Sequence, residues 1–413
     1  MPRSDHYLSS ALLSAACLVP IAAAEGADAP PADGEGGDLW ARDVGDARLR
    51  LIDLAAITQV AVGGSGGDDE ELEWSQSGAH DPRRDGFDFQ QLELSIAGAV
   101  DPYFQAEAHL LVTEDEGLEL EEAFAVTTGL PHGLEVEAGL MLTEFGRYNP
   151  QHTHEYAHID QPLVIGTMLG SEGTRDIGAR VGWLLPVDWF SELHLSVQNG
   201  DNETAVSFLG EGHHHGEEEE EEHGGRNIDA IDEVLWSARW VNGLALSEDA
   251  EIQIGISGAY GPNAEDHTVL GGADVVFKWF NPRASGGAGT LSWTTEFIWR
   301  EAGADEAEEE ASDWGLVSTA VYDLTPRWRA GLRLDYVDLE EHDEHDEHDE
   351  HDEEEEHLPA QGLRISPLLG YRPSEFTTFR LQYNYSDPDE GDEVHSVWLG
   401  LEVLIGTHPA HSF

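Results

Sequence analysis

The sequence predicts an all-β chain, a transmembrane antiparallel β-barrel of about 16 strands with long acidic extracellular loops. Three observations support this prediction. Apolar and polar residues alternate with a period of two over segments of about a dozen residues, and short and long connections alternate between these segments. An uninterrupted apolar run of about 18 residues, which a membrane helix requires, is missing. Only alternate residues of a barrel strand face lipid, so a chain of modest overall hydrophobicity can still form a membrane barrel.

The N-terminal part is predicted to be removed or unstructured. Residues 1–24 have the pattern of a secretory signal peptide, with Arg3 before the apolar run ALLSAACLVPIAAA. The only cysteine, Cys17, lies in this run, so the mature chain would have no disulfide or thiolate metal site, and a lipoprotein signal at Cys17 is the less favoured alternative. Residues 25–47, rich in Gly, Pro, Ala and Asp, predict a disordered periplasmic lead-in. No plug-sized domain is expected before the barrel, which should occupy 48–413.

The strands are predicted from the alternation alone. In the last one, 394–405, Val397, Leu399 and Leu401 share one face and Ser396 and Glu402 share the other. Charged residues on one face and large apolar residues on the other fit a lipid-facing exterior and a wet lumen. The predicted strands are 48–62, 87–100, 102–113, 118–128, 133–143, 176–185, 189–199, 233–241, 250–260, 273–281, 289–301, 313–323, 326–337, 361–371, 376–386 and 394–405.

Aromatic residues favour the membrane over a soluble barrel. Tryptophans fall mostly near strand ends, as expected of girdles at the two membrane interfaces. The chain ends in Phe413 after its last strand, which resembles the assembly signal of bacterial outer-membrane proteins. We therefore expect a location in the bacterial outer membrane, with its lipid as a partner. The predicted girdle residues are Trp183, Trp236, Trp240, Trp279, Trp293, Trp299, Trp314, Trp328 and Trp398.

Loop lengths predict which end faces outward. Short turns of such barrels face the periplasm and long loops face the exterior. The long connections include 63–86, 144–175, 200–232 and 338–360, so the extreme charge runs are predicted to lie outside the cell.

The net charge limits the possible partners. Lys and Arg total 20 against 84 Asp and Glu, a formal net charge of −64. Such a surface repels nucleic acid and attracts cations. An alternative is that the acidity is a general trait of proteins from saline habitats.

Two low-complexity loops are candidate metal-binding segments. GHHHGEEEEEEHGG lies within 200–232, and EEHDEHDEHDEHDEEEEH lies within 338–360. Imidazole and carboxylate groups bind divalent ions such as zinc, and loops without a rigid frame should bind several ions weakly. The alternative is a solvated acidic loop. The predicted ligands are His213, His214, His215, His223, His342, His345, His348, His351 and His357.

The connection 144–175 has an ordered composition instead of a repeat. It holds His152, His154, Glu155, His158 and Asp160, which are candidates to line a constriction or to bind a divalent ion, and the three histidines are the further predicted metal ligands. Residues of these types also occur in loops that are held by hydrogen bonds alone, and this alternative remains open.

A family resemblance appears in four stretches: FQQLELSIAGAVDPYFQAEAHL, ELEEAFAV, LEVEAGLMLTEFGRYNPQHTHEYAHIDQP and the ending GTHPAHSF. They resemble zinc-associated, porin-like outer-membrane proteins of Gram-negative bacteria, and more distantly phosphate-selective porins. The resemblance is strongest over 87–186. It implies that 144–175, as the third external loop, narrows the channel, and that a homotrimer is possible. Some members of the family carry a TonB-dependent label, which the expected lack of a plug contradicts.

Charged strand residues are predicted to line the pore. They form either a basic ladder facing acidic loops or simple pairs with lumenal carboxylates. Lys278 is a lone lysine on a strand, so the clustered lysines of a phosphate channel are missing. The predicted pore-lining residues are Arg180, Arg239, Arg300, Arg329, Arg333, Arg380, Glu296 and Asp335.

The sequence matches GxSxG at GGSGG (63–67) and HExxH at HEYAH (154–158), but both matches fall in predicted connections, whereas the chemistry requires a strand-to-helix turn for the first and a helix for the second. We therefore expect no enzyme and no required cofactor. The predicted function is passive diffusion of small solutes with a preference for cations, while the external loops concentrate divalent metal, most of all zinc. The alternative is a surface metal-binding or adhesive protein that a closed barrel anchors.

Overall fold

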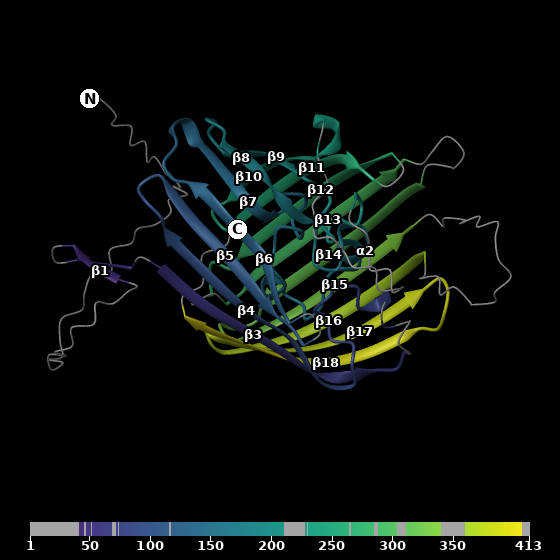
Figure 1. The fold of residues 1–413 in the computed structure, drawn as a ribbon. Helices are drawn as coiled ribbons and strands as arrows, with labels where there is room; N and C mark the ends of the chain where they lie inside the picture. The colour runs from purple at the N-terminus through teal and green to yellow at the C-terminus, as the bar shows by residue number, and fades with distance from the viewer. Residues whose placement is uncertain are drawn as a thin grey trace, which may run out of the picture. The chain divides into compact units, whose positions relative to one another are not determined.

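The computed structural model describes residues 41–44, 47–50, 52–67, 72, 74–114, 117–209, 228, 230–263, 266–284, 288–303, 311–339 and 360–406 (Figure 1). The signal peptide predicted for 1–24 and the lead-in up to residue 40 lie outside the described residues. The end of the predicted lead-in is paired, because β1 (Ala41–Val44) and β2 (Ala47–Arg50) form a small antiparallel hairpin.

Sixteen strands, β3 to β18, form a closed antiparallel barrel, which confirms the predicted fold class. Each strand pairs with its neighbours in sequence, and β18 pairs with β3 to close the ring. The strands are β3 (Ile52–Ser65), β4 (Gly86–Ala99), β5 (Phe104–Val112), β6 (Leu118–Thr127), β7 (Leu134–Leu142), β8 (Arg175–Leu184), β9 (Phe190–Gln198), β10 (Leu235–Ser247), β11 (Ala250–Pro262), β12 (His267–Phe280), β13 (Thr290–Ala302), β14 (Ala311–Asp323), β15 (Trp328–Asp338), β16 (Gln361–Ser374), β17 (Thr377–Pro388) and β18 (Val394–Gly406).

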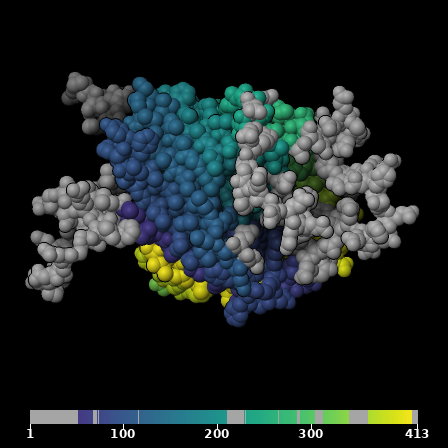
Figure 2. Space-filling model, in the orientation of Figure 1, coloured from purple at the N-terminus to yellow at the C-terminus, as the bar shows by residue number. Residues whose placement is uncertain are grey.

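The apolar face of the strands points outward. On β18, Val397 and Leu399 are 49% and 44% exposed, whereas Ser396 between β17 and β3 is buried. On β17, Leu381 is exposed and Gln382 is buried. This is the reverse of a soluble barrel and is the arrangement that lipid requires. Figure 2 shows the side chains of the first strands covering the barrel wall without interruption on the side in view.

The tryptophans divide between the two faces. Six of the predicted girdle residues are exposed on the outer surface: Trp183, Trp236, Trp240, Trp293, Trp314 and Trp328. Trp398 is 0% exposed and points into the barrel, so its assignment to the girdle is wrong. It occupies an inward position between Ser396 and Gly400, and its ring lies against Gly63 of β3.

Two strands extend about six residues beyond a predicted boundary, more than the other strands do. β10 continues through Asn242 and Gly243, although the dipeptide Asn-Gly is typical of a tight turn. Asn242 pairs with Ser191 of β9 and therefore lies within the strand. β12 begins at His267, which reduces the long loop predicted over 261–272 to a short connection. Leu270 explains this second error, because it faces inward and is buried, so the apolar residues of this stretch do not alternate.

The described parts of three long connections contribute to the interior of the barrel. The connection between β7 and β8, residues 143–174 and here called L3, contains the helix α2 (Leu163–Leu169). This helix begins after Pro162 and lies against β14 and β15, within the ring of strands (Figure 1). Its five buried apolar side chains contribute about 1.5–3 kcal/mol each to the docking of L3.

An apolar core therefore forms inside the barrel. It joins L3 to the connection between β3 and β4 (residues 66–85, called L1), to the first part of the connection after β9 (199–209, called L4) and to inward strand residues. In the described part of the chain, no helix has the length and apolarity to cross a membrane. The core consists of Trp74, Phe145, Tyr148, Tyr156, Leu163, Val164, Ile165, Met168, Leu169, Ala205, Phe208, Leu235, Ala259, Leu270, Ile298, Val317 and Val337.

Candidate functional site

A buried group of histidines and glutamates joins L3 to the barrel wall. We call it the His-Glu cluster. Three adjacent strands, β4, β5 and β6, supply carboxylates and one imidazole, and the part of L3 around the short helix η2 (Thr153–Glu155) supplies two more imidazoles. The members are Glu93, His109, Glu121, Glu122, His152 and His154.

A β-bulge brings two consecutive glutamates into this cluster. His109 of β5 pairs with Glu122, and the next residue, Leu110, pairs with Leu120. Glu121 is therefore the extra residue of the bulge. In a regular strand Glu121 and Glu122 would point to opposite faces, but here both are buried.

Glu93 lies at the centre of the cluster. Its Oε1 is 3.2 Å from Nδ1 of His109 and accepts a hydrogen bond of 2.7 Å from the Ser95 hydroxyl. Its Oε2 is 2.7 Å from Nδ1 of His154 and 3.9 Å from Nδ1 of His152. One carboxylate thus contacts imidazoles from both the wall and L3.

His152 lies between the two glutamates of the bulge. Its Nδ1 is 2.8 Å from Glu121 and its Nε2 is 3.0 Å from Glu122. Burial alone would lower the pKa of His152, but Glu121 and Glu93 outweigh burial and raise the pKa well above 6.5. The ring centroid of His152 is 4.5 Å from that of His109 and 5.7 Å from that of His154.

The predicted ligands in L3 separate into two environments. His152 and His154 belong to the cluster. His158 contacts the backbone oxygen of Ser366 on β16 at 2.9 Å, and burial together with Arg333 lowers the pKa of His158 to about 3. His158 is therefore neutral and donates a hydrogen bond there. The nine predicted ligands of the two acidic loops lie outside the described residues.

The sequence prediction missed the strand members of the cluster. Glu93 and His109 occupy inward positions of two neighbouring strands, a signal that is present in the alternation. Placing them beside His152 also requires the strand register, the bulge at Glu121 and the inward path of L3. None of these follows from spacing along the chain.

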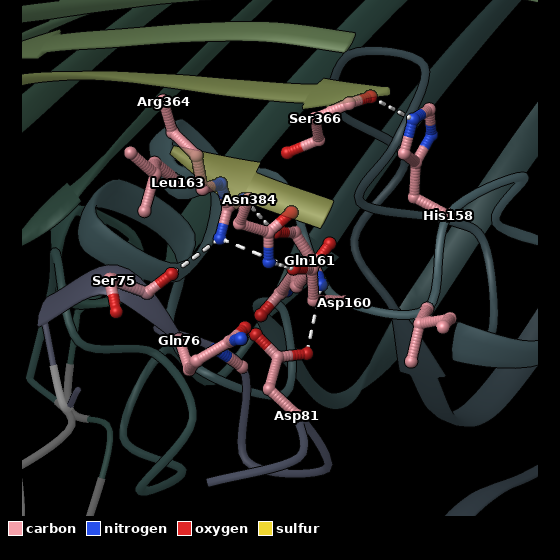
Figure 3. A network of polar contacts seen from close by, with 12 residues as sticks. Ser75, Gln76, Asp81, His158, Asp160, Gln161, Leu163, Arg364, Ser366 and Asn384 are labelled. Carbon is pink, nitrogen blue, oxygen red and sulfur yellow. Dashed lines mark hydrogen bonds and ion pairs between the residues drawn. The ribbon is translucent and has the colours of Figure 1, made fainter. Parts of the chain in front are cut away.

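A second polar network anchors L3 to strands β15, β16 and β17, apart from the strands of the His-Glu cluster (Figure 3). The Asp160 carboxylate is 2.5 Å from Nη2 of Arg333 and accepts hydrogen bonds from Gln382 (2.8 Å) and Asn384 (2.7 Å). Burial would raise the pKa of Asp160, but Arg333 and Arg364 lower it below its usual range. Asp160 therefore stays ionised and holds L3 to three strands.

Arg364, which the sequence prediction did not include, connects L1 to L3. It donates hydrogen bonds of 2.5 Å to the backbone oxygens of Ser75 in L1 and Gln161 in L3 (Figure 3). Its Nε is 3.3 Å from Asp335, which also accepts from Arg333 at 2.8 Å.

Each of the six predicted lumenal arginines pairs with a carboxylate. Arg180, for example, bridges Glu137 at 2.7 Å and Glu144 at 2.8 Å. The predicted lumenal Glu296 accepts backbone hydrogen bonds from L3, at Arg147 (2.7 Å) and Tyr148 (2.9 Å). Each of these six arginines is thus neutralised by a carboxylate, which corresponds to the second predicted arrangement and not to a basic ladder. The other pairs are Arg239 with Asp274, Arg300 with Asp313, Arg329 with Asp323, Arg333 with Asp160 and Asp335, and Arg380 with Glu402.

Comparison with known proteins identifies the class of fold. No family model matches the chain. A protein of Aquifex aeolicus (strain VF5), described as uncharacterized, is 28% identical over 354 residues, which cover 79% of this chain and 70% of the relative.

The solved structures that resemble the barrel are outer-membrane proteins. The trimer form of OmpT from Vibrio cholerae has a TM-score of 0.54 at 8% identity, and covers 86% of this chain and 99% of its own. The anion-selective porin from Comamonas acidovorans has a TM-score of 0.52 at 10% identity, and the match covers 86% of this chain and 99% of the porin. OprB from Pseudomonas putida has a TM-score of 0.53 at 12% identity, and the match covers 86% of this chain and 94% of OprB.

The chain therefore has the fold of the outer-membrane porins. Together with the apolar outer face, this fold places it in the bacterial outer membrane, as predicted. The resemblance to the zinc-associated family remains a prediction.

Proposed function

We propose that this protein is a passive outer-membrane channel that prefers cations and concentrates divalent metal ions, with zinc the first candidate. The observation that carries the proposal is the charge of the barrel interior. The predicted lumenal arginines are each neutralised by at least one carboxylate, and further buried carboxylates, such as Glu93 and Glu122, contact histidine instead of arginine. An interior in which carboxylates exceed arginines favours cation entry and disfavours anions.

The acidic loops support the same proposal from the sequence. The runs 213–223 and 342–357 carry histidine and carboxylate in dense repeats. At the channel mouth they would raise the local concentration of divalent cations, which then diffuse past L3. The mechanism needs no energy coupling.

Planar-bilayer recording tests the channel. In a gradient of KCl, the zero-current potential should have the sign of a cation-selective pore. The opposite sign would refute the cation preference. Complete absence of open-channel current in folded, inserted protein would refute the channel itself.

A histidine substitution separates ion coordination from electrostatics. Replacing the nine loop histidines by asparagine keeps the acidic charge and removes the imidazoles. We expect less zinc bound per chain with an unchanged zero-current potential. Unchanged zinc binding would contradict a role for these loops in metal capture. A variant with the glutamates of 217–222 replaced by glutamine, but with all histidines kept, is the matched control and should reduce the cation preference.

The apolar core inside the barrel favours one alternative function. Side chains of L1, L3 and L4, including Trp74, Val164 and Phe208, pack together within the ring of strands. A barrel filled in this way suits a surface metal-binding protein whose barrel is an anchor. Such a protein would bind zinc at its loops and conduct no current. A homotrimer is a further proposal, supported by the trimer form of OmpT, and chemical cross-linking in detergent would test it.

A further inference from the structure

The His-Glu cluster combines three imidazoles and three carboxylates from two segments that are far apart in the sequence. Glu93 and His109 are fixed on the rigid wall, whereas His152 and His154 arrive on L3. Arginine and lysine do not contribute to the contacts described for these six side chains. The described ion pairs of these carboxylates are therefore with imidazoles, and Arg180 adds a more distant electrostatic interaction with Glu122.

The spacing of the donor atoms fits one small cation. Ligand atoms of Glu93, His109 and His152 all lie within 4.8 Å of one another. For zinc with bonds of about 2.1 Å, tetrahedral geometry places neighbouring ligand atoms about 3.4 Å apart. Nδ1 of His109 is 3.2 Å from Oε1 of Glu93 and Nδ1 of His152 is 3.9 Å from Oε2 of Glu93, so the two carboxylate oxygens lie at distances on either side of this value.

The surroundings orient these donors as metal sites do. Nε2 of His152 contacts Glu122, and the other oxygen of Glu122 accepts a backbone hydrogen bond of 2.7 Å from Leu142. A carboxylate on one imidazole nitrogen fixes the orientation of the ring. The other nitrogen of His152, Nδ1, faces Glu121 at 2.8 Å and Glu93 at 3.9 Å, so a bound ion would replace the proton between Nδ1 and these carboxylates. The Ser95 hydroxyl holds Glu93 in the same way.

We propose that Glu93, His109 and His152 bind one divalent transition-metal ion of the zinc class, beside His154, whose Nδ1 contacts Glu93 at 2.7 Å. The set of nitrogen donors with one carboxylate suits zinc or cobalt better than calcium or magnesium, which prefer oxygen ligands. The ion would tie L3 to the β4–β6 wall. This inference deepens the proposed function, because it gives the divalent cation a defined site within the barrel.

Metal titration of the full chain in detergent tests the proposal. Co²⁺ is the probe, since its visible absorption reports nitrogen and oxygen ligands in tetrahedral geometry. We expect one saturable site per chain, filled before the weak sites of the acidic loops. Glu93→Gln and His109→Asn should abolish this first phase, and Glu122→Gln should weaken it about 10–100-fold.

His194→Asn is the matched control. His194 lies on β9, is also largely buried, and is 3.6 Å from Glu192, but it is not part of the cluster. This variant should keep the first phase. Heat-modifiable gel migration verifies that each variant is folded, and Glu122→Gln remains informative if a ligand variant does not fold.

Two results would overturn the proposal. One is a wild-type chain that binds Co²⁺ only weakly and at many sites. The other is a first phase that survives both Glu93→Gln and His109→Asn, and either result would leave the cluster as a hydrogen-bonded anchor for L3. The titration requires no current, so a chain that binds Co²⁺ here but does not conduct would refute the channel and leave this site standing.

Discussion

Asp160 of L3 and Arg333 of β15 form a buried ion pair, with 2.5 Å between Oδ1 and Nη2 and both side chains almost fully excluded from solvent. Asp160 is also the acceptor for Gln382 and Asn384 of β17 and lies 3.7 Å from Arg364 of β16, so one loop carboxylate connects L3 to three strands. Without the Asp160 carboxylate, Arg333 would still have Asp335 as a carboxylate partner.

Asp160→Asn should release L3 from this wall. Breaking a buried pair from one side costs about 3–5 kcal/mol when the remaining charge is left without a partner. Arg333 keeps Asp335 at 2.8 Å, so we expect a cost at the lower end of this range. We expect faster cleavage of L3 by added protease and a lower midpoint in urea unfolding. Asp266→Asn is the control, because Asp266 forms an exposed contact with His267 that contributes about 0–1 kcal/mol. Equal effects of the two substitutions would contradict the anchoring role of Asp160.

The strands were predictable because lipid and lumen impose opposite requirements on alternate residues. The faces of β17 and β18 follow directly from that alternation, as Leu381 and Gln382 illustrate. The prediction failed where an apolar residue faces inward. Leu270 packs in the core that contains L3 residues, and Trp398 lies against Gly63 of β3, and no local pattern indicates either contact.

The candidate site was only half predictable for a related reason. His152 and His154 stand out in the sequence because they lie close together in a loop of ordered composition. Glu93 and His109 look like ordinary inward residues of polar strands. Their role depends on where L3 docks, and that depends on contacts such as Asp160 with Arg333, which are 173 residues apart.

Gly146 in L3 supports a second anchoring contact. Its φ is +63°, and a Cβ at this position would collide with the Glu296 carboxylate, which accepts backbone hydrogen bonds from Arg147 and Tyr148. Gly146→Ala should therefore displace this carboxylate in addition to the cost of about 1–2 kcal/mol for a left-handed alanine. The measurement is the free energy of unfolding in urea.

Gly129→Ala measures only the cost of placing an alanine in the left-handed backbone conformation, without a steric collision. Gly129 has φ of +73° and open space where its Cβ would lie, in the turn between β6 and β7. We expect Gly146→Ala to be the more destabilising of the two by more than about 1 kcal/mol, the size of a lost hydrogen bond. If both substitutions have the same effect, the contact of Glu296 with the L3 backbone does not stabilise the loop.

His158 should make the docking of L3 sensitive to acid. Burial and Arg333 lower its pKa from 6.5 to about 3, so between these values the released loop binds a proton that the docked loop does not. Docking therefore weakens as pH falls through this range, by at most about tenfold per pH unit. The pKa of Asp81 in L1, which burial and Asp160 raise to about 7, acts in the opposite direction, because it weakens the folded form as pH rises. Protease cleavage of L3 across this range, compared between wild type and His158→Gln, measures the effect. Glutamine retains an N–H donor for the Ser366 oxygen but does not titrate, so the acid-dependent increase in cleavage should become smaller, and an unchanged increase would assign it to another group.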